Sequence, residues 1–597
     1  MLRITWADGQ PLDLNLTVEL GCHPLSRIAE SKEMTVSDES AESVSAVYRI
    51  EDEYEANVRV QQYGPGGEGI RVQSLIQKVS GAPENVYYFW SWSLPEEIRR
   101  PLQWGDEVEE YLPPEGWGHG GFHDWYWMRY GEMGLGLVTP MYLLTSGSRY
   151  GNRCYLKPFP IERQLLLSGG PGLEEQFVFF TAENPDEAAD GWKNVISRED
   201  LFAVPWERVK DDAAPAPQWL RDTEIFQGLY RPWSEGTIDT RVRQFPLVIG
   251  APVDAHLVDL TQQSGTRTAI YVNFMGQYTF KPDQRKPWER ALEFTDALHI
   301  DQHPEWQKID SDGQPVIHEG ERRTTHAPCF LAPGYIEHCL DVLEPVLETE
   351  PDAIFIDNCF FRITACSGAE LGKHEHRTDY PNDMAAYRGL IERVAEKAHS
   401  QGIAVLCNSE VDPGLWDVAD GQMYECLWYP PGKGQMIRTK SWTHTRYAGE
   451  IWNEATQKGN TVQPLHYLMV EPIEHRVEAT LLTYAWAQLY DLMWTDWYNL
   501  FDSPHQPSKE IAHKLYGLRL GAPKQDTLRM QSGCLWRSFE NGMVILNPLR
   551  ETVQLELPIE TGLTDIATGE QIHTQNGSIE VQMPPQEATI LVKDSSP

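Results

Sequence analysis

The run Asp352-Ala-Ile-Phe-Ile-Asp357-Asn358 lies near the middle of the chain and decides the expected fold. Its apolar residues predict a short buried strand that ends at Asp357 and Asn358. Residues 333–349, which precede it, carry apolar side chains at the spacing of an amphipathic helix. A helix followed by a strand that ends in a carboxylate is typical of a (β/α)8 barrel, whose reactive groups follow the strands. The alternative is an Asp that faces solvent or caps a helix.

The same order of helix, apolar run and polar residue recurs between about residues 220 and 520. A helical pattern at residues 385–400 precedes an expected strand at 402–408, which ends at Asn408 and is followed by Glu410. The next expected strand spans residues 421–428 and contains Glu425. Residues 411–420 leave room for only a short crossover between these two strands.

Further expected strands lie on both sides of this region. An early strand at residues 266–274 follows an amphipathic stretch at 253–263 and carries Asn273 near its end. A strand at residues 464–470 closes on Glu471, and a strand at 492–496 follows a helix at 474–489 and ends at Asp496. Less regular runs at residues 224–229 and 326–330 are candidates for the first and third strands. Together these segments predict a central (β/α)8 barrel, with the loop at residues 277–325 unassigned.

The two flanks have a different texture, with short alternating segments between Gly and Pro turns. Residues 1–205 predict a large antiparallel β-sandwich domain, and a Pro-rich connector leads from it to the barrel. We therefore expect three domains: an N-terminal β-sandwich at residues 1–205, the barrel at 215–522 and a small C-terminal β-sandwich at 523–597.

Composition and charge exclude several classes of protein. The 597 residues are 41% hydrophobic, enough for large cores, and the formal net charge of −38 argues against nucleic acid or anionic membranes as partners. No stretch approaches about 18 apolar residues without charges, and the N-terminus lacks the pattern of a signal peptide. We expect a cytoplasmic protein with no membrane contact; an exported protein given without its leader is the alternative. The oligomeric state is left open.

Cysteine usage indicates reduced thiols and no cofactor. The nine cysteines are an odd number, and Cys359, Cys407 and Cys426 lie on or beside expected barrel strands. No pair with CxxC spacing and no helical histidine motif indicates zinc. The pair His119 and His123 is separated by two glycines and is interpreted as part of a substrate or interface loop. We expect no metal and no cofactor.

Aromatic residues point to a carbohydrate. They make up 11% of the chain, with 21 Trp, and several lie close to the candidate acids: Trp428, Tyr429, Trp494 and neighbouring rings. Flat rings beside carboxylates suit sugars, because the C–H faces of a sugar stack on aromatics while its hydroxyls bond to acids and amides. The alternative is that these tryptophans only fill the core.

The chain resembles retaining α-glycosidases of the α-galactosidase clan. The resemblance rests on the order of a β-sandwich, a barrel and a small β-sandwich, and on four segments: residues 111–117, residues 127–136, Asn547-Pro548 and Thr568-Gly569. Inside the barrel, the set Asp357-Asn358, Asn408, Asp420-Gly421 and Glu425 is also similar to endo-α-1,4-polygalactosaminidase-type hydrolases. The α-galactosidase clan carries its nucleophile and its acid/base on strands four and six. When the two less regular strands are counted, Asp357 ends strand four and Glu425 lies on strand six. The resemblance therefore implies these roles for Asp357 and Glu425.

Glycoside hydrolysis needs one ionised carboxylate and one protonated carboxylic acid. Asp357 has a polar neighbour suited to the ionised role, while apolar neighbours would raise the pKa of Glu425 and suit it to the acid role. Glu471 or Asp496 is the alternative second carboxylate. The expected substrate ligands are Asn273, Asn358, Asn408, Glu410, Trp428, Tyr429, Glu471, Trp494 and Asp496.

The sequence thus predicts a retaining glycoside hydrolase that acts on α-linked glycans or oligosaccharides. A catalytically silent glycan-binding protein on the same scaffold is the alternative. The sugar, its linkage and exo or endo action are left open.

Overall fold

A computed structural model describes most of the chain from residue 216 onward and the strands of the part before it. Up to residue 191 the described residues are the strands given below with residues 79–80, 182, 187 and 191. Beyond that they are 216–228, 242, 245–281, 284–285, 287–310, 313–359, 366–369, 371–380, 383–408, 415, 418–424, 461–464, 476–496, 504–524, 529–549, 551–559 and 562–593.

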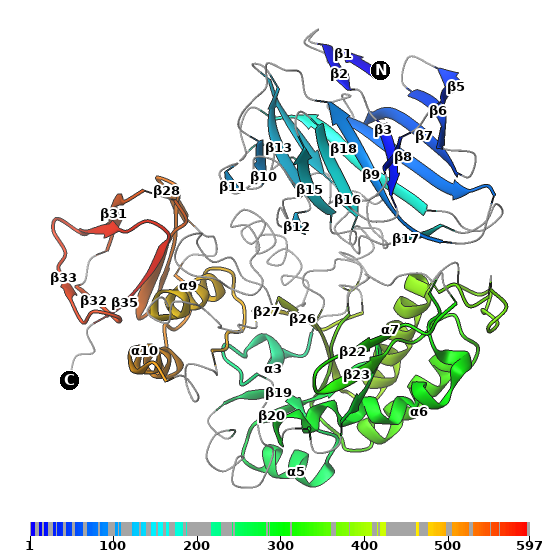
Figure 1. The fold of residues 1–597 in the computed structure, drawn as a ribbon. Coiled ribbons are helices and arrows are strands. Elements are labelled where there is room, and N and C mark those ends of the chain that lie inside the picture. The colour runs from blue at the N-terminus through cyan, green and yellow to red at the C-terminus, as the bar shows by residue number, and fades with distance from the viewer. Residues whose placement is uncertain are drawn as a thin grey trace.

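The first part of the chain forms antiparallel sheets, as the sequence predicts (Figure 1). A nine-stranded sheet has the order β11-β10-β13-β14-β18-β8-β7-β6-β5, and a seven-stranded sheet has the order β12-β15-β16-β9-β3-β4, with β17 paired to β9. The small hairpin β1-β2 is separate. The strands are β1 (Leu2–Thr5), β2 (Pro11–Leu14), β3 (Thr17–Gly21), β4 (Ile28–Glu30), β5 (Glu33–Glu39), β6 (Ser43–Ile50), β7 (Tyr54–Tyr63), β8 (Gly69–Lys78), β9 (Glu84–Ser93), β10 (Leu102–Trp104), β11 (Glu107–Val108), β12 (Phe122–His123), β13 (Trp125–Tyr130), β14 (Met133–Val138), β15 (Thr145–Tyr150), β16 (Arg153–Pro158), β17 (Arg163–Leu165) and β18 (Leu173–Thr181).

The middle of the chain forms a six-stranded parallel sheet in the order β19-β20-β24-β25-β26-β27. Helices α5, α6 and α7 connect the first four strands, because parallel neighbours need a crossover. The strands are β19 (Leu247–Ala251), β20 (Arg267–Val272), β24 (Ala353–Ile356), β25 (Ala404–Asn408), β26 (Gly421–Tyr424) and β27 (Thr461–Pro464). The helices are the short α3 (Gln218–Arg221), then α5 (Ala255–Gln263), α6 (Tyr335–Leu347) and α7 (Asp383–Ser400).

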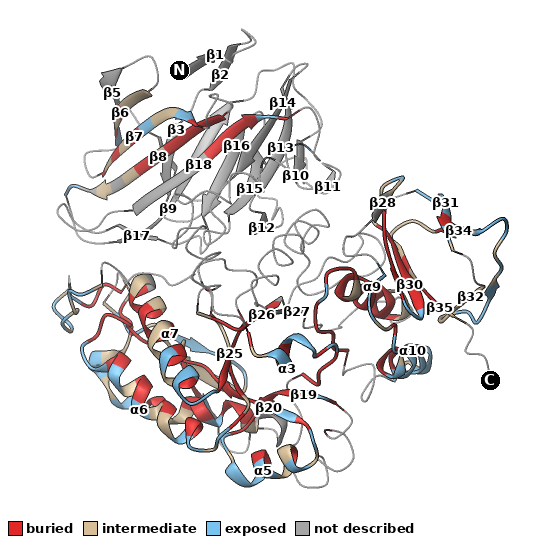
Figure 2. Ribbon diagram, turned by 180° about the vertical axis from the view of Figure 1, so that it is seen from behind, coloured by how far each residue is buried: buried red, intermediate tan, exposed pale blue. Residues whose placement is uncertain are grey.

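The two faces of this sheet pack against different partners, since side chains alternate along a strand. One face, here called the helix face, packs on α5, α6 and α7, and it includes Ile270, Ile354, Val405 and their neighbours. The opposite face carries a second apolar cluster that includes Leu247, Ile249, Ala269, Tyr271, Ala353, Phe355, Ala404, Leu406 and Met423. Figure 2 shows the strands buried and the helices with one buried and one exposed side. Both faces are therefore covered, which fits the apolar runs of these strands.

Two short segments continue the parallel order beyond β19. Gln227 forms a parallel bridge with Val248 in β19, and Ile225 forms a parallel bridge with Trp494. The backbone N–H of Phe226 donates to the Trp494 carbonyl at 3.1 Å, and the Trp494 N–H donates to the Glu224 carbonyl at 2.9 Å. The predicted strand near residues 224–229 is therefore present as a short parallel segment that joins β19 to the segment at Trp494.

Three details of the predicted strand list need correction. The sequence pattern overlooks β19, a five-residue strand, and the predicted third strand at residues 326–330 is wrong. Residues 323–326 form β23 (Arg323–His326), which pairs antiparallel with β21 (Gln277–Phe280) and β22 (Ile317–Glu319). The strand expected at residues 464–470 begins earlier, at Thr461 of β27 (Thr461–Pro464), and residues 465–470 are outside the described part. When the segment at Gln227 is counted as the first strand, β19 is the second, β20 the third and β24 remains the fourth.

The loop that had no assignment, between β20 and α6, contains this three-stranded sheet and three 3-10 helices. These are η4 (Pro287–Leu298), η5 (Ile300–Gln302) and η6 (Pro304–Trp306). The ring of Phe274 packs edge-on against Phe294 in η4, with the ring centroids 5.4 Å apart. The insertion thus lies at the carboxyl end of β20.

The last part of the chain returns to antiparallel strands. Helices α9 (Arg476–Leu489) and α10 (Gln506–Gly517) pack together, and α9 contacts the C-terminal sheet (Figure 1). The strands form a six-stranded sheet, β28-β29-β30-β35-β32-β33, and a two-stranded sheet, β31-β34. They are β28 (Arg529–Gln531), β29 (Cys534–Phe539), β30 (Gly542–Asn547), β31 (Val553–Pro558), β32 (Leu563–Asp565), β33 (Gln571–Ile572), β34 (Ser578–Met583) and β35 (Glu587–Lys593). One apolar cluster joins the two sheets, with Leu555, Ile579 and Leu591 among its buried members.

Within the described residues, none of the helices combines the length and apolarity that crossing a bilayer requires.

Candidate active site at the carboxyl end of the parallel sheet

Asp357 directly follows β24, at the carboxyl end of the parallel sheet. Its N–H donates to the Val272 carbonyl at 2.9 Å, so it continues the hydrogen-bond ladder with β20. Asn358 then turns the chain, with φ of 55° in the left-handed region that Asn tolerates better than most residues. The Tyr387 hydroxyl in α7 donates to the Asn358 carbonyl at 3.1 Å and holds the turn. The carboxylate is therefore fixed at the end of a buried strand.

Four hydrogen-bond donors surround the Asp357 carboxylate. The Tyr271 hydroxyl donates to Oδ2 at 2.7 Å, and Asn408 Nδ2 donates to Oδ1 at 2.9 Å. The backbone N–H of Asn358 donates to Oδ1 at 2.9 Å, and its side-chain Nδ2 lies 3.2 Å from Oδ2. Donors to a carboxylate stabilise the ionised form and fix the orientation of its oxygens. This arrangement holds both oxygens of the Asp357 carboxylate in place.

A second layer orients one of these donors. Asn273 Nδ2 lies 3.1 Å from the Tyr271 hydroxyl and 2.9 Å from the Tyr278 hydroxyl, while its Oδ1 accepts from the Met275 N–H at 2.9 Å. The Tyr271 hydroxyl can therefore accept from Asn273 while it donates to Asp357. Burial, and then the negative charge of Asp357, raise the pKa of Tyr278, so its hydroxyl stays protonated.

The alternation of side chains explains why these groups converge. Tyr271, Phe355 and Leu406 all pack on the opposite face of the sheet. Asn273, Asp357 and Asn408 each come two residues later on the same three strands and so point to the same side. The register pairs Ile356 with Cys407, which sets Asp357 and Asn408 side by side.

The structure shows where three of the predicted site residues lie relative to Asp357. Asn273 is fully buried and Asn408 is 3% exposed, and both bond within the network around Asp357. These two amides therefore orient the carboxylate, where the sequence predicts contact with substrate. Asn358 is half-buried and remains beside the carboxylate.

Trp494 and Asp496 are buried against α9 and α10. The Trp494 ring has no exposed surface and packs against Tyr484 and Tyr516, with Nε1 donating to Thr483 Oγ1 at 3.1 Å. The neighbouring Met493 packs with the cluster on the opposite face of the parallel sheet. Because side chains alternate along a strand, Trp494 points the other way, toward α9 and α10. Asp496 is also fully buried and accepts from Thr480 Oγ1 of α9 at 2.7 Å. Their role as substrate ligands stays a prediction, which this burial does not support.

The remaining predicted site residues lie outside the described part of the chain. They are Glu410, Glu425, Trp428, Tyr429 and Glu471. Their roles stay predictions.

Two side chains of the network around Asp357 were not predicted from the sequence, namely Tyr271 and Tyr278. Tyr271 lies on the strand that carries Asn273, at a position that the alternation assigns to the same face. The shared face of Tyr271 and Asn273 is the signal that the sequence offers. That the Tyr271 hydroxyl reaches Asp357 follows only from the register between β20 and β24.

The cysteines follow the expectation for reduced thiols where the structure describes them. Cys359 and Cys407 are buried free thiols, and burial raises the pKa of Cys359. Cys426 lies outside the described residues. Among the residues that the structure describes, one group of Cys and His side chains could hold a metal ion, and it lies in the loops before α6 and before α7.

Comparison with known proteins gives similarity of fold but not of sequence. The structure of α-N-acetylgalactosaminidase NagBb from Bifidobacterium bifidum in complex with GalNAc matches over 92% of this chain and 98% of that chain, with a TM-score of 0.52 and 11% identity. A quadruple mutant of the same enzyme gives a TM-score of 0.54 with the same coverage and identity. A GH31 family sulfoquinovosidase from E. rectale matches at a TM-score of 0.47 and 9% identity, over 100% of this chain and 96% of that chain, which is too weak to support an argument.

At these identities the likeness concerns the fold alone. The sequence matches no family model and no curated protein.

Proposed function

We propose that the protein is a glycoside hydrolase that cleaves α-linked glycans or oligosaccharides, with Asp357 as its ionised carboxylate. The observation that carries the proposal is the four-donor setting of Asp357 at the carboxyl end of β24. In a glycosidase, a carboxylate held in this way can stabilise or attack the positively charged anomeric carbon. The shared fold with NagBb, which is described as an α-N-acetylgalactosaminidase, adds support for a sugar substrate.

The second carboxylate in this proposal is Glu425. It comes two residues after Met423, which packs on the opposite face of β26. If the alternation continues for two more residues, Glu425 shares the side of the sheet on which Asp357 lies. Two strand spacings separate the backbones of β24 and β26 by about 10 Å, a gap that an Asp and a Glu side chain leaning together can shorten.

The proposed mechanism is retaining. A retaining enzyme holds its two carboxyl groups about 5–5.5 Å apart, so that one can bond to the sugar while the other protonates the leaving oxygen. Asp357 would be the nucleophile and Glu425 the acid and then the base. A separation of about 6.5–9.5 Å would instead leave room for a water and indicate inversion. Glu471 is the alternative partner, whereas the burial of Asp496 against α9 argues against that residue.

We also propose that the parallel sheet belongs to a closed (β/α)8 barrel between two β-sandwich domains. The bridges of Gln227 with Val248 and of Ile225 with Trp494 support closure, because they add two parallel segments beyond β19. The predicted domain limits, at residues 1–205, 215–522 and 523–597, go with this proposal. A catalytically silent glycan-binding protein would keep the same architecture.

Turnover on a panel of aryl α-glycosides tests the function, since a silent binder would give affinity without product. Asp357→Asn should abolish turnover on every substrate. Glu425→Gln should slow substrates with poor leaving groups by about 10²–10⁴-fold and spare activated ones, as expected of a general acid. Asp341→Asn, at an exposed position on α6, is the matched control and should change neither. Full activity of Asp357→Asn would refute the assignment.

A further inference from the structure

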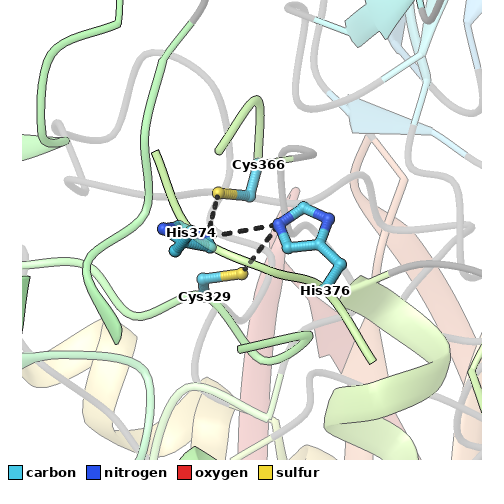
Figure 3. A group of neighbouring side chains, drawn as sticks. All are labelled: Cys329, Cys366, His374 and His376. Carbon is cyan, nitrogen blue, oxygen red and sulfur yellow. Dashed lines mark hydrogen bonds between the residues drawn. The ribbon is translucent and has the colours of Figure 1, made fainter. Parts of the chain in front are cut away.

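Four side chains that are distant in sequence meet beside the sheet, as Figure 3 shows. Cys329 lies in the loop between β23 and α6, while Cys366, His374 and His376 lie in the loop between β24 and α7. Both cysteines are buried and both histidines are half-buried. The four rings and thiols point toward one another from two separate loops (Figure 3).

The ligand atoms of these side chains gather around one point. All four lie within 4.8 Å of one another. Cys329 Sγ is 3.4 Å from His376 Nε2, Cys366 Sγ is 3.4 Å from His374 Nε2, and the two Nε2 atoms are 3.2 Å apart. Each imidazole Nε2 thus has two close partners.

Hydrogen bonding alone does not explain this convergence. A ring nitrogen carries one proton or one lone pair, so it serves one partner along its axis and not two. A tetrahedral zinc ion with Zn–S bonds of about 2.3 Å and Zn–N bonds of about 2.0–2.1 Å spaces sulfur from nitrogen by about 3.6 Å, and nitrogen from nitrogen by about 3.3 Å. The three distances here are close to those spacings.

The surroundings of Cys366 favour a thiolate ligand. The backbone N–H groups of Ile309 and Gly368 both lie 3.3 Å from Cys366 Sγ. Donors to sulfur stabilise its negative charge, and such contacts orient a metal ligand. Ile309 belongs to a third segment, so the site is held from more than its own loops.

Asp383, at the start of α7, ties the two loops together. Its Oδ1 accepts from the Phe330 N–H and its Oδ2 from the Cys366 N–H, both at 3.1 Å. Phe330 follows Cys329 directly, so this buried carboxylate fixes the backbone beside one cysteine from each loop. One buried side chain therefore holds the backbone of both cysteine loops in place.

We propose that Cys329, Cys366, His374 and His376 bind one zinc ion as a structural site. Two thiolates and two imidazoles in a tetrahedron are a ligand set that selects zinc. Four protein ligands close the coordination sphere, whereas catalytic zinc keeps a position open for water or substrate. The ion would clamp the loop that follows β20 to the loop that follows β24.

A short chain of contacts connects the four proposed zinc ligands with the candidate active site. The Phe330 ring packs on Tyr387 with centroids 4.7 Å apart, and the Tyr387 hydroxyl donates to the Asn358 carbonyl. Loss of zinc would therefore loosen the turn that follows Asp357. The zinc proposal does not depend on the proposed function, because metal content is measured without activity.

Metal analysis of the full-length purified protein tests the proposal. After dialysis against metal-free buffer we expect about one zinc per chain, and Cys366→Ser or His376→Gln should lower it to about a tenth or less. Cys534→Ala and His318→Gln are the matched controls, a buried thiol on β29 and an exposed histidine on β22, and should keep full zinc.

A second measurement covers the case in which the variants fail to fold. Wild-type protein stripped with a chelator and reloaded with Co²⁺ should show thiolate-to-cobalt charge-transfer bands and the visible bands of tetrahedral cobalt. Protein without stoichiometric zinc and without these bands would overturn the proposal. So would a mass two hydrogens lower under non-reducing conditions with no metal bound, which would mean that Cys329 and Cys366 form a disulfide instead.

Discussion

Asn408 donates a hydrogen bond to Asp357 across 2.9 Å, although the two residues lie 51 positions apart in the chain. The parallel register of β24 and β25 sets them side by side, and the Asn408 side chain is almost fully buried. The amide thus contributes one of the four donors that fix the carboxylate.

Asn408→Leu removes the donor and keeps the branching of the side chain at Cγ. A hydrogen bond to a charged group contributes about 1.5–3 kcal/mol, which corresponds to about a 10- to 150-fold loss of kcat if it is fully used in the transition state. Steady-state kinetics on an activated aryl α-glycoside measures the loss. Asn541→Leu, at a turn of the C-terminal sheet, should keep kcat, and an Asn408→Leu enzyme as fast as that control would refute the role.

Tyr271→Phe and Tyr278→Phe form a matched pair that separates the two layers of the network. The Tyr271 hydroxyl contacts the Asp357 carboxylate, whereas the Tyr278 hydroxyl bonds to Asn273. We expect kcat to fall by about 10- to 100-fold for Tyr271→Phe and by less than about 10-fold for Tyr278→Phe. Equal losses would mean that the contact with Asp357 has no special weight.

Local sequence signals predict the elements around Asp357 well, because helical period and apolar runs act within one segment. The expected helices at residues 333–349 and 385–400 are α6 and α7, and the strand before Asp357 is β24. The prediction omits β19, although its buried run of five residues is the same kind of signal as the four residues of β24. Trp494 shows a second limit: its place beside Asp496 suggests a site, but its partners come from α9 and α10.

Contacts between distant segments set the rest of the site. Tyr271 pairs in register with Phe355, so its hydroxyl reaches forward along the strands to Asp357. The cysteine and histidine group is still less visible in sequence, because Cys329 joins the others only through the packing of two loops. The pair His374 and His376 is its only compact local signal.

His399 should make the free energy of unfolding decrease as the pH rises above the ordinary pKa of histidine. Its Nε2 lies 2.7 Å from Asp420 Oδ2, and this hydrogen bond raises the pKa of His399 against the opposing effect of burial. A raised folded-state pKa means that the stabilisation is complete below the unfolded pKa of about 6.5 and is lost as pH rises through the folded value. Because the His399 side chain is 42% exposed, we expect about 1 kcal/mol or less.

Urea unfolding at a series of pH values measures this effect. His399→Gln should unfold with the same free energy as wild type at high pH and a lower one at acidic pH. His318→Gln, at an exposed position on β22, controls for loss of a histidine. A difference between His399→Gln and wild type that grows with pH would contradict the sign.

Gly368→Ala should weaken the zinc site without removing a ligand. A Cβ at Gly368 would lie 2.2 Å from His374 Cε1 and 2.3 Å from Nε2, a separation that forces the ring to move. Displacement of an oriented ligand costs about 10- to 100-fold in metal affinity. Competition with a chromophoric chelator measures the affinity of the purified protein.

Gly517→Ala is the control for that experiment, because a Cβ there would meet nothing within 4 Å. It should bind zinc as wild type does. The thermal midpoint adds an independent readout: saturating zinc at about 100 times its Kd stabilises the native state by about 2.7 kcal/mol, so added zinc should raise the midpoint less for Gly368→Ala at equal free zinc. Wild-type affinity in Gly368→Ala would mean that His374 is not held where the tetrahedral site requires it.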